Sequence, residues 1–331
     1  MHRYFSDTTL ASEQCAQCEK EITVDPTKVA RIPAAMRKYI GKNYTERPND
    51  AEWPHISQTI RASDSARMLL KLKKSLKSGM GRAAEAAGFV DRHSRRAMTI
   101  VAFHRVNDEL PEDGLTCRTE KFIEFCRFFL RNFRIVNLSE QVEACRRGLN
   151  MGGTLSVTFD DGYADNFTVA APLLKTLKIP ATFFVTTGFI GSKIVPPWDD
   201  QLLIPQQWMS WDQVRKLVSQ GFEIGSHTDQ HVKLSGCDPS VIRSDLQRSK
   251  DTLEREIGMR IGLFAYPFGG QGDISESSRT LIREIGFDCC LSCFGGVNRI
   301  TSDPYYFQRV NIGAWFASPH QFALEFLLNR I

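Results

Sequence analysis

The sequence predicts an α/β barrel, and three observations indicate this fold class. Short segments rich in β-branched and aromatic residues recur from Thr99 onward, with helical patterns between them. The segments are apolar on both faces, as buried parallel strands are. Polar residues follow several of them directly, as at the C-terminal strand ends of α/β barrels. The expected strands are 99–103, 154–159, 181–186, 222–226, 263–266, 288–293 and 305–311.

Helix signals lie in the intervals between these strands. Ser210 and Gln213 form a capping box, and Asp238 followed by Pro239 opens a long helix toward Ile257. Two further intervals show apolar residues at helical spacing, which are Phe122, Phe125 and Phe129 in one and Ala171, Leu174 and Leu177 in the other. This repeated alternation of strand and helix indicates a wound sheet or a barrel, and seven strands favour the barrel.

The composition is that of a globular protein with a sizeable core. Of the 331 residues 42% are hydrophobic, and the formal charge of +4 is too small to demand a nucleic-acid partner. Nine cysteines follow no disulfide framework, and the first thirty residues show no signal-peptide pattern. We therefore expect a cytoplasmic protein or one peripheral to the inner membrane, and an extracytoplasmic one if the natural N-terminus differs.

Two segments precede the barrel pattern. Residues 1–66 are polar, lack sustained periodicity and predict a poorly ordered or helical extension. Residues 67–97 carry nine Lys or Arg, with Met68, Leu69, Leu72 and Leu76 on one helical face, which predicts a basic amphipathic helix. Such a helix suits an anionic membrane surface or an acidic partner; alternatively, its apolar stripe packs on the main domain.

The strongest chemical signal is a pair of carboxylates at one strand end, followed by a histidine pair. Asp160 and Asp161 end the strand 154–159, and His227 and His231 follow a later strand. Asp161, His227 and His231 together suit a divalent metal such as Zn²⁺ and leave positions open for water, as in a hydrolytic site. Asp160 is then a candidate general base, if the strand breaks at Gly162 so that both carboxylates converge. Alternatively, Asp160 caps the following helix.

A general acid is also needed, and His104 is the candidate. It ends the strand 99–103 and titrates near neutrality. A single histidine at the end of an apolar strand is also compatible with a structural role.

These motifs resemble the polysaccharide deacetylase family, also called the NodB-homology or carbohydrate esterase family 4 group. The resemblance rests on Thr158–Gly162, on Ser226–His231 and on Tyr266–Gly269, in this order. It covers roughly residues 98–315 and implies a domain at 98–331 with a distorted (β/α)7 barrel. It also implies metal-dependent removal of N-acetyl groups from amino sugars, with Zn²⁺, Co²⁺, Ni²⁺ or Mn²⁺ as the metal.

The resemblance assigns roles to individual residues. It makes Asp160 the base, makes Asp161, His227 and His231 the metal ligands, and puts the backbone N–H near Phe268 in the oxyanion site. We further expect Trp198 to contact the sugar and consider Tyr163 as a second substrate contact.

The chain departs from the family pattern at two places. Ala265 stands where many members have the arginine that orients the base, and Arg309 from the late strand is the candidate replacement. The late Leu-x-His segment that usually supplies the acid is absent after residue 300. The branch acting on poly-N-acetylglucosamine exopolysaccharides has its acid histidine early, and Ala102–Val106 with His104 is similar to that segment.

The predicted function is therefore hydrolysis of N-acetyl groups on an amino-sugar polymer or glycan-lipid precursor. Asp160 acts as base, His104 as acid and a metal-bound water as nucleophile. Two alternatives stay open at this point. One is a hydrolase of non-sugar C–N amide bonds on the same fold, and the other is a non-catalytic carbohydrate-binding relative.

Overall fold

The computed structural model describes residues 64–202 and 204–328, with the backbone alone for residues 64–70. The chain divides into two units, Met1–Leu69 and Leu70–Ile331. The description below concerns the second unit, apart from the first residues of one helix. The predicted polar extension 1–66 lies outside the described residues except for 64–66, which are helical.

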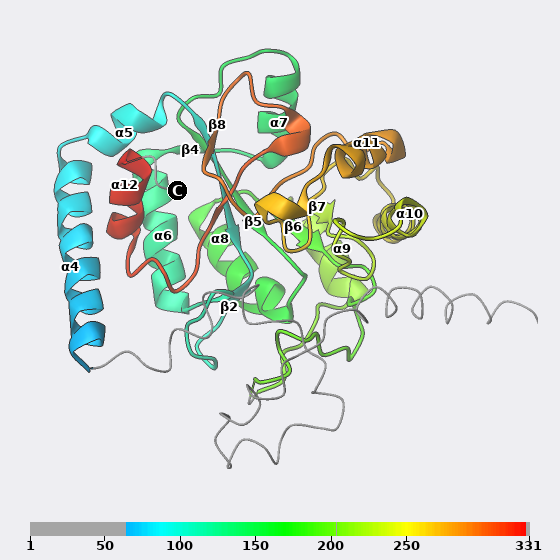
Figure 1. The fold of residues 1–331 in the computed structure, drawn as a ribbon, viewed down its shortest axis with the longest axis horizontal. Coiled ribbons are helices and arrows are strands. Elements are labelled where there is room, and N and C mark those ends of the chain that lie inside the picture. Colours follow the sequence, from blue (N-terminus) through cyan, green and yellow to red (C-terminus); the bar gives the residue numbers. More distant parts are fainter. Residues whose placement is uncertain (1–63, 203, 329–331) are drawn as a thin grey trace, which may run out of the picture. The chain divides into compact units, whose positions relative to one another are not determined.

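A parallel ladder of four strands forms the centre of the second unit (Figure 1). In spatial order the strands are β7 (Glu223–Ser226), β6 (Ala181–Val185), β5 (Thr154–Phe159) and β1 (Met98–Phe103). β1 and β5 are paired in register from Thr99 opposite Leu155 to Phe103 opposite Phe159. Every residue of β1, β5 and β6 is buried, as expected for parallel strands. The first four predicted strands are thereby confirmed.

The other three predicted strands pair mainly through isolated bridges. The parallel bridges join Ser226 with Phe264, Ala265 with Leu291, and Leu291 with Phe307. β9 (Val310–Asn311) then pairs in parallel with β1. The α/β fold class is confirmed, and all seven predicted segments take part in strand pairing. Only β7, β6, β5 and β1 form a continuous parallel ladder, however, whereas the remaining segments pair at single residues or two-residue strands. Pro267 contributes to the irregularity, because proline has no N–H to extend a ladder after Tyr266.

Four short strands were not predicted, because two residues are too few for a periodic pattern. β2 (Arg105–Val106) pairs with β3 (Thr116–Cys117) in a separate small sheet. β4 (Arg134–Ile135) pairs with the start of β5, and β8 (Val297–Asn298) runs antiparallel to β1.

The helices that follow the strands begin where the sequence signals predict them. Ser210 accepts a hydrogen bond from the backbone N–H of Gln213 in a capping box, and Asp238 caps the next long helix through Ser240. The helices of the second unit beyond residue 100 are α6 (Thr119–Asn132), α7 (Leu138–Arg146), α8 (Ala171–Leu177), α9 (Trp211–Ser219), α10 (Pro239–Ile257), α11 (Glu276–Ile285) and α12 (Pro319–Leu327).

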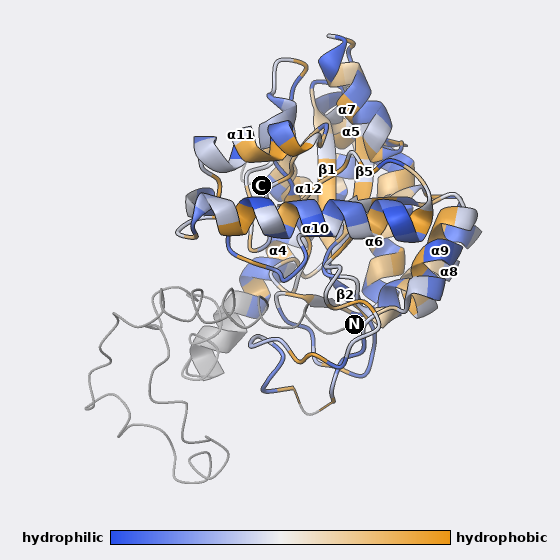
Figure 2. Ribbon diagram, turned by 90° about the vertical axis from the view of Figure 1, so that its right-hand side faces the viewer, coloured by the Kyte–Doolittle hydropathy of each residue, from blue (hydrophilic) through white to orange (hydrophobic). Residues whose placement is uncertain are grey.

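The core is rich in phenylalanine. Phe159 of β5 lies between Phe103 and Phe183 of the neighbouring strands, with ring centroids 5.6 and 4.9 Å apart. Phe122 of α6 contacts both Phe103 and Phe159 edge-on, so the predicted apolar face of this helix lies on the sheet. Figure 2 shows β1 and β5 in the hydrophobic colours and α10 with alternating hydrophilic and hydrophobic residues.

The predicted basic helix 67–97 is two helices. α4 (Asp64–Ala86) and α5 (Phe89–Ser94) are separated at Gly88, whose φ of 72° ends the helical path. Among the described residues, no helix combines the length and apolar character that crossing a membrane requires.

Candidate functional site

Polar side chains gather at the C-terminal ends of the parallel strands. His104 follows β1, Asp160 and Asp161 follow β5, and His227 follows β7. All four side chains are buried. They follow three strands of the same parallel ladder, β1, β5 and β7, and the C-terminal edge of such a ladder is where α/β barrels carry their functional groups.

Left-handed backbone conformations shape these strand ends. Among the described residues, five other than glycine have positive φ, and four of these belong to the site motifs: Asp161 (73°), Thr228 (66°), His231 (54°) and Phe268 (60°). Such conformations are uncommon for residues with a Cβ and concentrate at functional sites. The sequence predicted a strand break at Gly162, and Gly162 has a left-handed φ of 91°; the preceding Asp161 is left-handed as well. The break allows two adjacent carboxylates to serve one site.

Asp161, His227 and His231 form a tight cluster of acceptor atoms. Oδ1 of Asp161 lies 3.3 Å from Nε2 of His227 and 3.3 Å from Nε2 of His231. Nδ1 of His227 lies 2.9 Å from the carbonyl oxygen of Ala265. That carbonyl can only accept, so it holds the proton on Nδ1 and directs the lone pair of Nε2 toward Asp161.

This cluster fits a divalent cation. Oδ1 of Asp161 is buried and has no hydrogen-bond partner among the described residues, and Nε2 of His227 and Nε2 of His231 both face it. Buried acceptors that face one another without a donor are unfavourable unless a cation lies between them. One carboxylate oxygen with two imidazole nitrogens is also a donor set that Zn²⁺ accepts.

Asp160 forms a buried ion pair with Arg309. Nη1 of Arg309 donates to Oδ1 of Asp160 at 2.8 Å, and Nη2 donates to Oδ2 at 2.6 Å. Both side chains are fully buried. Nε of Arg309 donates to the carbonyl oxygen of Ser292, and Nη1 also reaches Oγ1 of Thr158. Arg309 therefore contacts the carboxylate that would otherwise lack an arginine, since position 265 is alanine.

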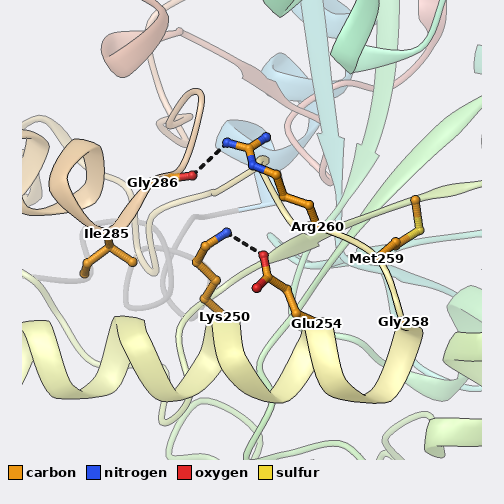
Figure 3. A pocket seen from close by; sticks show the side chains of 7 residues that line it. All are labelled: Lys250, Glu254, Gly258, Met259, Arg260, Ile285 and Gly286. Atoms are coloured by element: carbon orange, nitrogen blue, oxygen red, sulfur yellow. Dashed lines mark hydrogen bonds and ion pairs between the residues drawn. The ribbon is translucent and has the colours of Figure 1, made fainter.

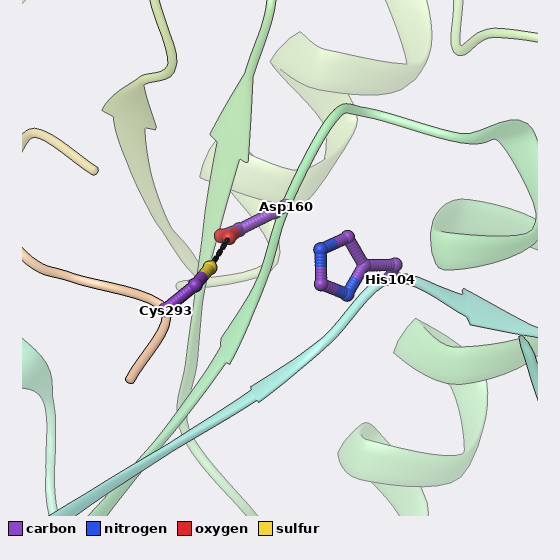
Figure 4. A group of neighbouring side chains, drawn as sticks. All are labelled: His104, Asp160 and Cys293. Carbon is purple, nitrogen blue, oxygen red and sulfur yellow. Dashed lines mark hydrogen bonds between the residues drawn. The ribbon is translucent and has the colours of Figure 1, made fainter. Parts of the chain in front are cut away.

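His104 and Cys293 also lie near Asp160, and they approach its carboxylate from different sides (Figure 4). One potential ligand atom from each of His104, Asp160 and Cys293 lies within 4.8 Å of the others. Sγ of Cys293 is 3.6 Å from Oδ2 of Asp160 and 3.2 Å from Nη2 of Arg309. Sequence reasoning missed Cys293, although it ends a predicted strand and its position at a strand end was a usable signal.

Burial and charge act in opposite directions on these groups. Burial alone would raise the pKa of the Asp160 carboxyl, but the charge of Arg309 holds this pKa below its usual value. Burial lowers the pKa of His104, and the charges of Asp161 and Asp160 oppose this effect. Asp160 is therefore an ionised, proton-accepting carboxylate at neutral pH.

Aromatic side chains line one flank of the cluster. The ring of Trp198 lies 4.5 Å from that of His231, and the half-exposed ring of Phe268 lies 4.9 Å from it. Nε1 of Trp198 donates to the hydroxyl of Tyr163, which donates to Oδ2 of Asp199. Tyr163 is almost fully buried, so it holds Trp198 in place and offers little surface of its own.

A buried arginine that the sequence did not single out completes this arrangement. Nη1 of Arg105 donates to Oδ1 of Asp199 at 2.5 Å, and Nε donates to Oγ1 of Thr116 at 3.0 Å. Only 1% of the Arg105 residue is exposed. The long loop that carries Trp198 is therefore fixed to β2 and β3 by a charged pair.

Asp245 of α10 fixes the loop between the two cluster histidines, although no local sequence pattern marks this residue. Its carboxylate accepts hydrogen bonds from the backbone N–H groups of Asp229 and Gln230, at 2.9 and 3.0 Å. Burial raises the pKa of Asp245 from 3.8 to about 6. The charge of Asp229 acts in the same direction, whereas the two backbone bonds and Arg248 oppose it.

This raised pKa predicts a pH-dependent stability that Asp245→Asn removes. The folded state binds the proton more tightly than the unfolded state, so the stabilisation is complete below pH 3.8 and is lost as the pH rises through about 6. The unfolding free energy of the wild type minus that of D245N should therefore fall by about 2 to 3 kcal/mol between roughly pH 4 and pH 7. Urea unfolding at both pH values measures it, with the exposed change Asp251→Asn on the same helix as control. A difference that stays constant with pH would contradict the prediction.

A surface hollow of about 680 Å³ lies elsewhere, at the end of α10 (Figure 3). Its polar lining groups bond to one another: Lys250 donates to Glu254 at 2.7 Å, and Arg260 donates to the carbonyl oxygen of Gly286 at 3.0 Å. Since these groups already have partners, the hollow shows no sign of a ligand site.

The fold and the cluster together define an α/β domain with a candidate metal centre at the C-terminal strand ends, an arrangement that suits metal-dependent hydrolysis. Residues 150–290 match the family model described as polysaccharide deacetylase. The structure is similar to that of IcaB from Ammonifex degensii, with a TM-score of 0.60 and 25% identity, over 70% of this chain and 97% of that chain. Over residues 150–290, which carry Asp160, Asp161, His227 and His231, the chain is thus similar to polysaccharide deacetylases.

Sequence relatives carry matching names. YxkH of Bacillus subtilis (strain 168), named as a polysaccharide deacetylase, is 30% identical over 113 residues, which are 34% of this chain and 36% of that protein. The poly-beta-1,6-N-acetyl-D-glucosamine N-deacetylase of Staphylococcus aureus (strain MRSA252) is 25% identical over 188 residues, 54% of this chain and 61% of that protein. The chain thus spans between about a third and three-fifths of the length of these two relatives.

Proposed function

We propose that this chain is a metal-dependent hydrolase that removes N-acetyl groups from an amino-sugar polymer or its precursor. The observation that carries the proposal is the convergence of Asp161, His227 and His231 beside the buried pair of Asp160 and Arg309. The similarity to poly-beta-1,6-N-acetyl-D-glucosamine N-deacetylases supports polymers of N-acetylglucosamine as the substrate class.

Asp161, His227 and His231 would hold the cation, and Zn²⁺ suits this donor set. When bound, the cation supplies a Lewis acid that lowers the pKa of a water molecule and polarises a carbonyl oxygen. The hydrogen bond from Nδ1 of His227 to Ala265 fixes the ring that presents Nε2, and Asp245 holds the loop that carries both histidines.

Asp160 serves as the general base in this proposal. The paired bonds from Arg309 fix the plane of its carboxylate and keep it ionised, so it can take a proton from the attacking water. Because this pair also lowers the basicity of Asp160, orientation is the larger part of what Arg309 contributes.

His104 serves as the general acid and gives a proton to the departing sugar amine. Its ring lies next to Asp160, and its buried Nδ1 has no hydrogen-bond partner in the described part of the chain. The backbone N–H of Phe268 is the candidate donor to the developing oxyanion, and the ring of Trp198 is the candidate surface for the sugar.

The two alternative functions receive less support. The hypothesis of a hydrolase for non-sugar amides was based on the missing arginine at position 265. Arg309 instead donates to the Asp160 carboxylate that this arginine would orient. The non-catalytic reading requires a decayed site, whereas the three candidate ligands, Asp160 and His104 are all gathered at one sheet edge.

The test combines metal analysis with acetate release from N-acetylglucosamine oligomers. We expect the purified full chain to carry one divalent metal, to release acetate, and to lose this activity on chelation and regain it on adding Zn²⁺. His104→Ala should keep the metal and lose about 10²- to 10³-fold in turnover, whereas His93→Ala, outside the cluster, should stay active. A metal-loaded chain inactive on every amino sugar would refute the proposal, and full turnover of H104A would refute the role of His104.

A further inference from the structure

Helix α4 exposes an apolar stripe. Leu72, Leu76 and Met80 are four residues apart, so they lie on one side of the helix, and their exposed fractions are 55%, 67% and 54%. Exposed apolar residues scattered singly are ordinary, but three in one line on a helix form a continuous surface. The stripe therefore requires an explanation.

The opposite side of α4 is polar and lies against the rest of the second unit. Nζ of Lys74 donates to the carbonyl oxygen of Ala314 at 2.9 Å, and Nζ of Lys77 pairs with Glu325 at 2.5 Å. Gly81 lies so close to the carbonyl oxygen of His320 that an added Cβ would meet this oxygen at 1.7 Å. A surface helix ordinarily turns its apolar side inward. In α4 the two sides are reversed, which contradicts packing on the main domain for Leu72 and Leu76, the two residues of the predicted apolar face whose side chains the structure describes.

The charges beside the stripe have one sign. Lys71 and Lys73 flank its start and Arg82 its end, and all three are exposed. The one carboxylate of the helix beyond residue 70, Glu85, instead points to the rest of the unit, where it pairs with Arg131 and His320. The outward side of α4 beyond residue 70 thus combines apolar side chains with cations and no carboxylate.

We propose that this stripe, Leu72, Leu76 and Met80 with the flanking Lys71, Lys73 and Arg82, is a docking surface for an anionic lipid bilayer. A helix with an apolar side bordered by cations lies in the plane of such a surface and inserts its apolar side between the headgroups. A second copy of the chain suits the stripe less well, because pairing two stripes brings cations against cations. This proposal is independent of the proposed chemistry.

Vesicle sedimentation with the full chain tests the proposal. We expect binding to phosphatidylglycerol-containing vesicles, weaker binding in high salt, and little binding to pure phosphatidylcholine. The variant Leu72→Ser/Leu76→Ser/Met80→Ser should lower the partition coefficient by roughly 100-fold. Its matched control is Leu149→Ser/Met259→Ser/Ile300→Ser, at positions exposed by 49%, 53% and 40%, which should bind like the wild type.

Charge variants and the oligomeric state complete the test. Lys71→Gln/Lys73→Gln should lower binding by roughly 10-fold or more, whereas Lys193→Gln/Lys216→Gln should not. The proposal is overturned if the wild type does not bind anionic vesicles at low salt, or if the control variants lose as much binding as the stripe variants. It is also overturned if light scattering without lipid finds a dimer that the triple stripe variant abolishes, which would assign the stripe to a second copy.

Discussion

Replacing Asp160 by asparagine is expected to lower acetate release by about 10³-fold while leaving the metal content unchanged. The amide cannot accept the proton of the attacking water, and it is nearly the same size as the carboxylate. Steady-state assays and metal analysis on the same preparation measure both quantities. The result would separate proton transfer from metal binding.

The neighbouring carboxylate supplies the comparison. Asp161→Asn removes a candidate ligand one residue away, so we expect it to lose metal as well as activity. The role of Asp160 as base would be contradicted if D160N kept more than about a tenth of the activity. It would also be contradicted if D160N lost its metal as D161N does.

Replacing Arg309 by methionine is expected to lower the unfolding free energy by about 3 to 5 kcal/mol, because it leaves the buried Asp160 carboxylate without its partner. Both side chains are fully buried, so water does not replace the lost bonds. Urea unfolding of the wild type and R309M measures the effect. Acetate release should fall with it, since the base loses the group that fixes its plane.

A double variant separates the effect of losing the charge pair from the effect of losing the volume of the arginine side chain. Asp160→Asn/Arg309→Met removes both charges, so it should recover a large part of the stability that R309M loses, but none of the activity. Full activity in R309M would show that Arg309 does not orient the base. An additive loss of stability in the double variant would show that the two charges are not coupled.

The regular half of the fold was predictable from local pattern. β1, β5 and β6 are short buried runs rich in apolar and β-branched residues, and capping residues such as Ser210 and Asp238 mark where helices begin. The pairing in the other half of the fold was harder to predict. The isolated bridges at Phe264 and Leu291 produce no periodic pattern in the sequence and depend on the neighbouring strands. The division of 67–97 into two helices depended on one glycine, Gly88, inside a continuous helical pattern.

The candidate site was predictable where a residue's chemistry and its place at a strand end coincide, as for Asp161 and His227. The pairing of Arg309 with Asp160 could be anticipated only from barrel topology. Asp245 and Arg105 could not, because their importance arises from buried contacts with distant backbone or side chains. No spacing rule reports such contacts.

The ion pair between Asp160 and Arg309 also bears on the order in which the molecule assembles. Its two members are 149 residues apart in sequence, one in the second strand of the ladder and one beside the last. Closing so long a loop is entropically costly and comes late in folding. A chain emerging from the ribosome therefore completes β5 long before the partner of its carboxylate exists. The reaction centre is expected to be among the last parts of the domain to become ordered.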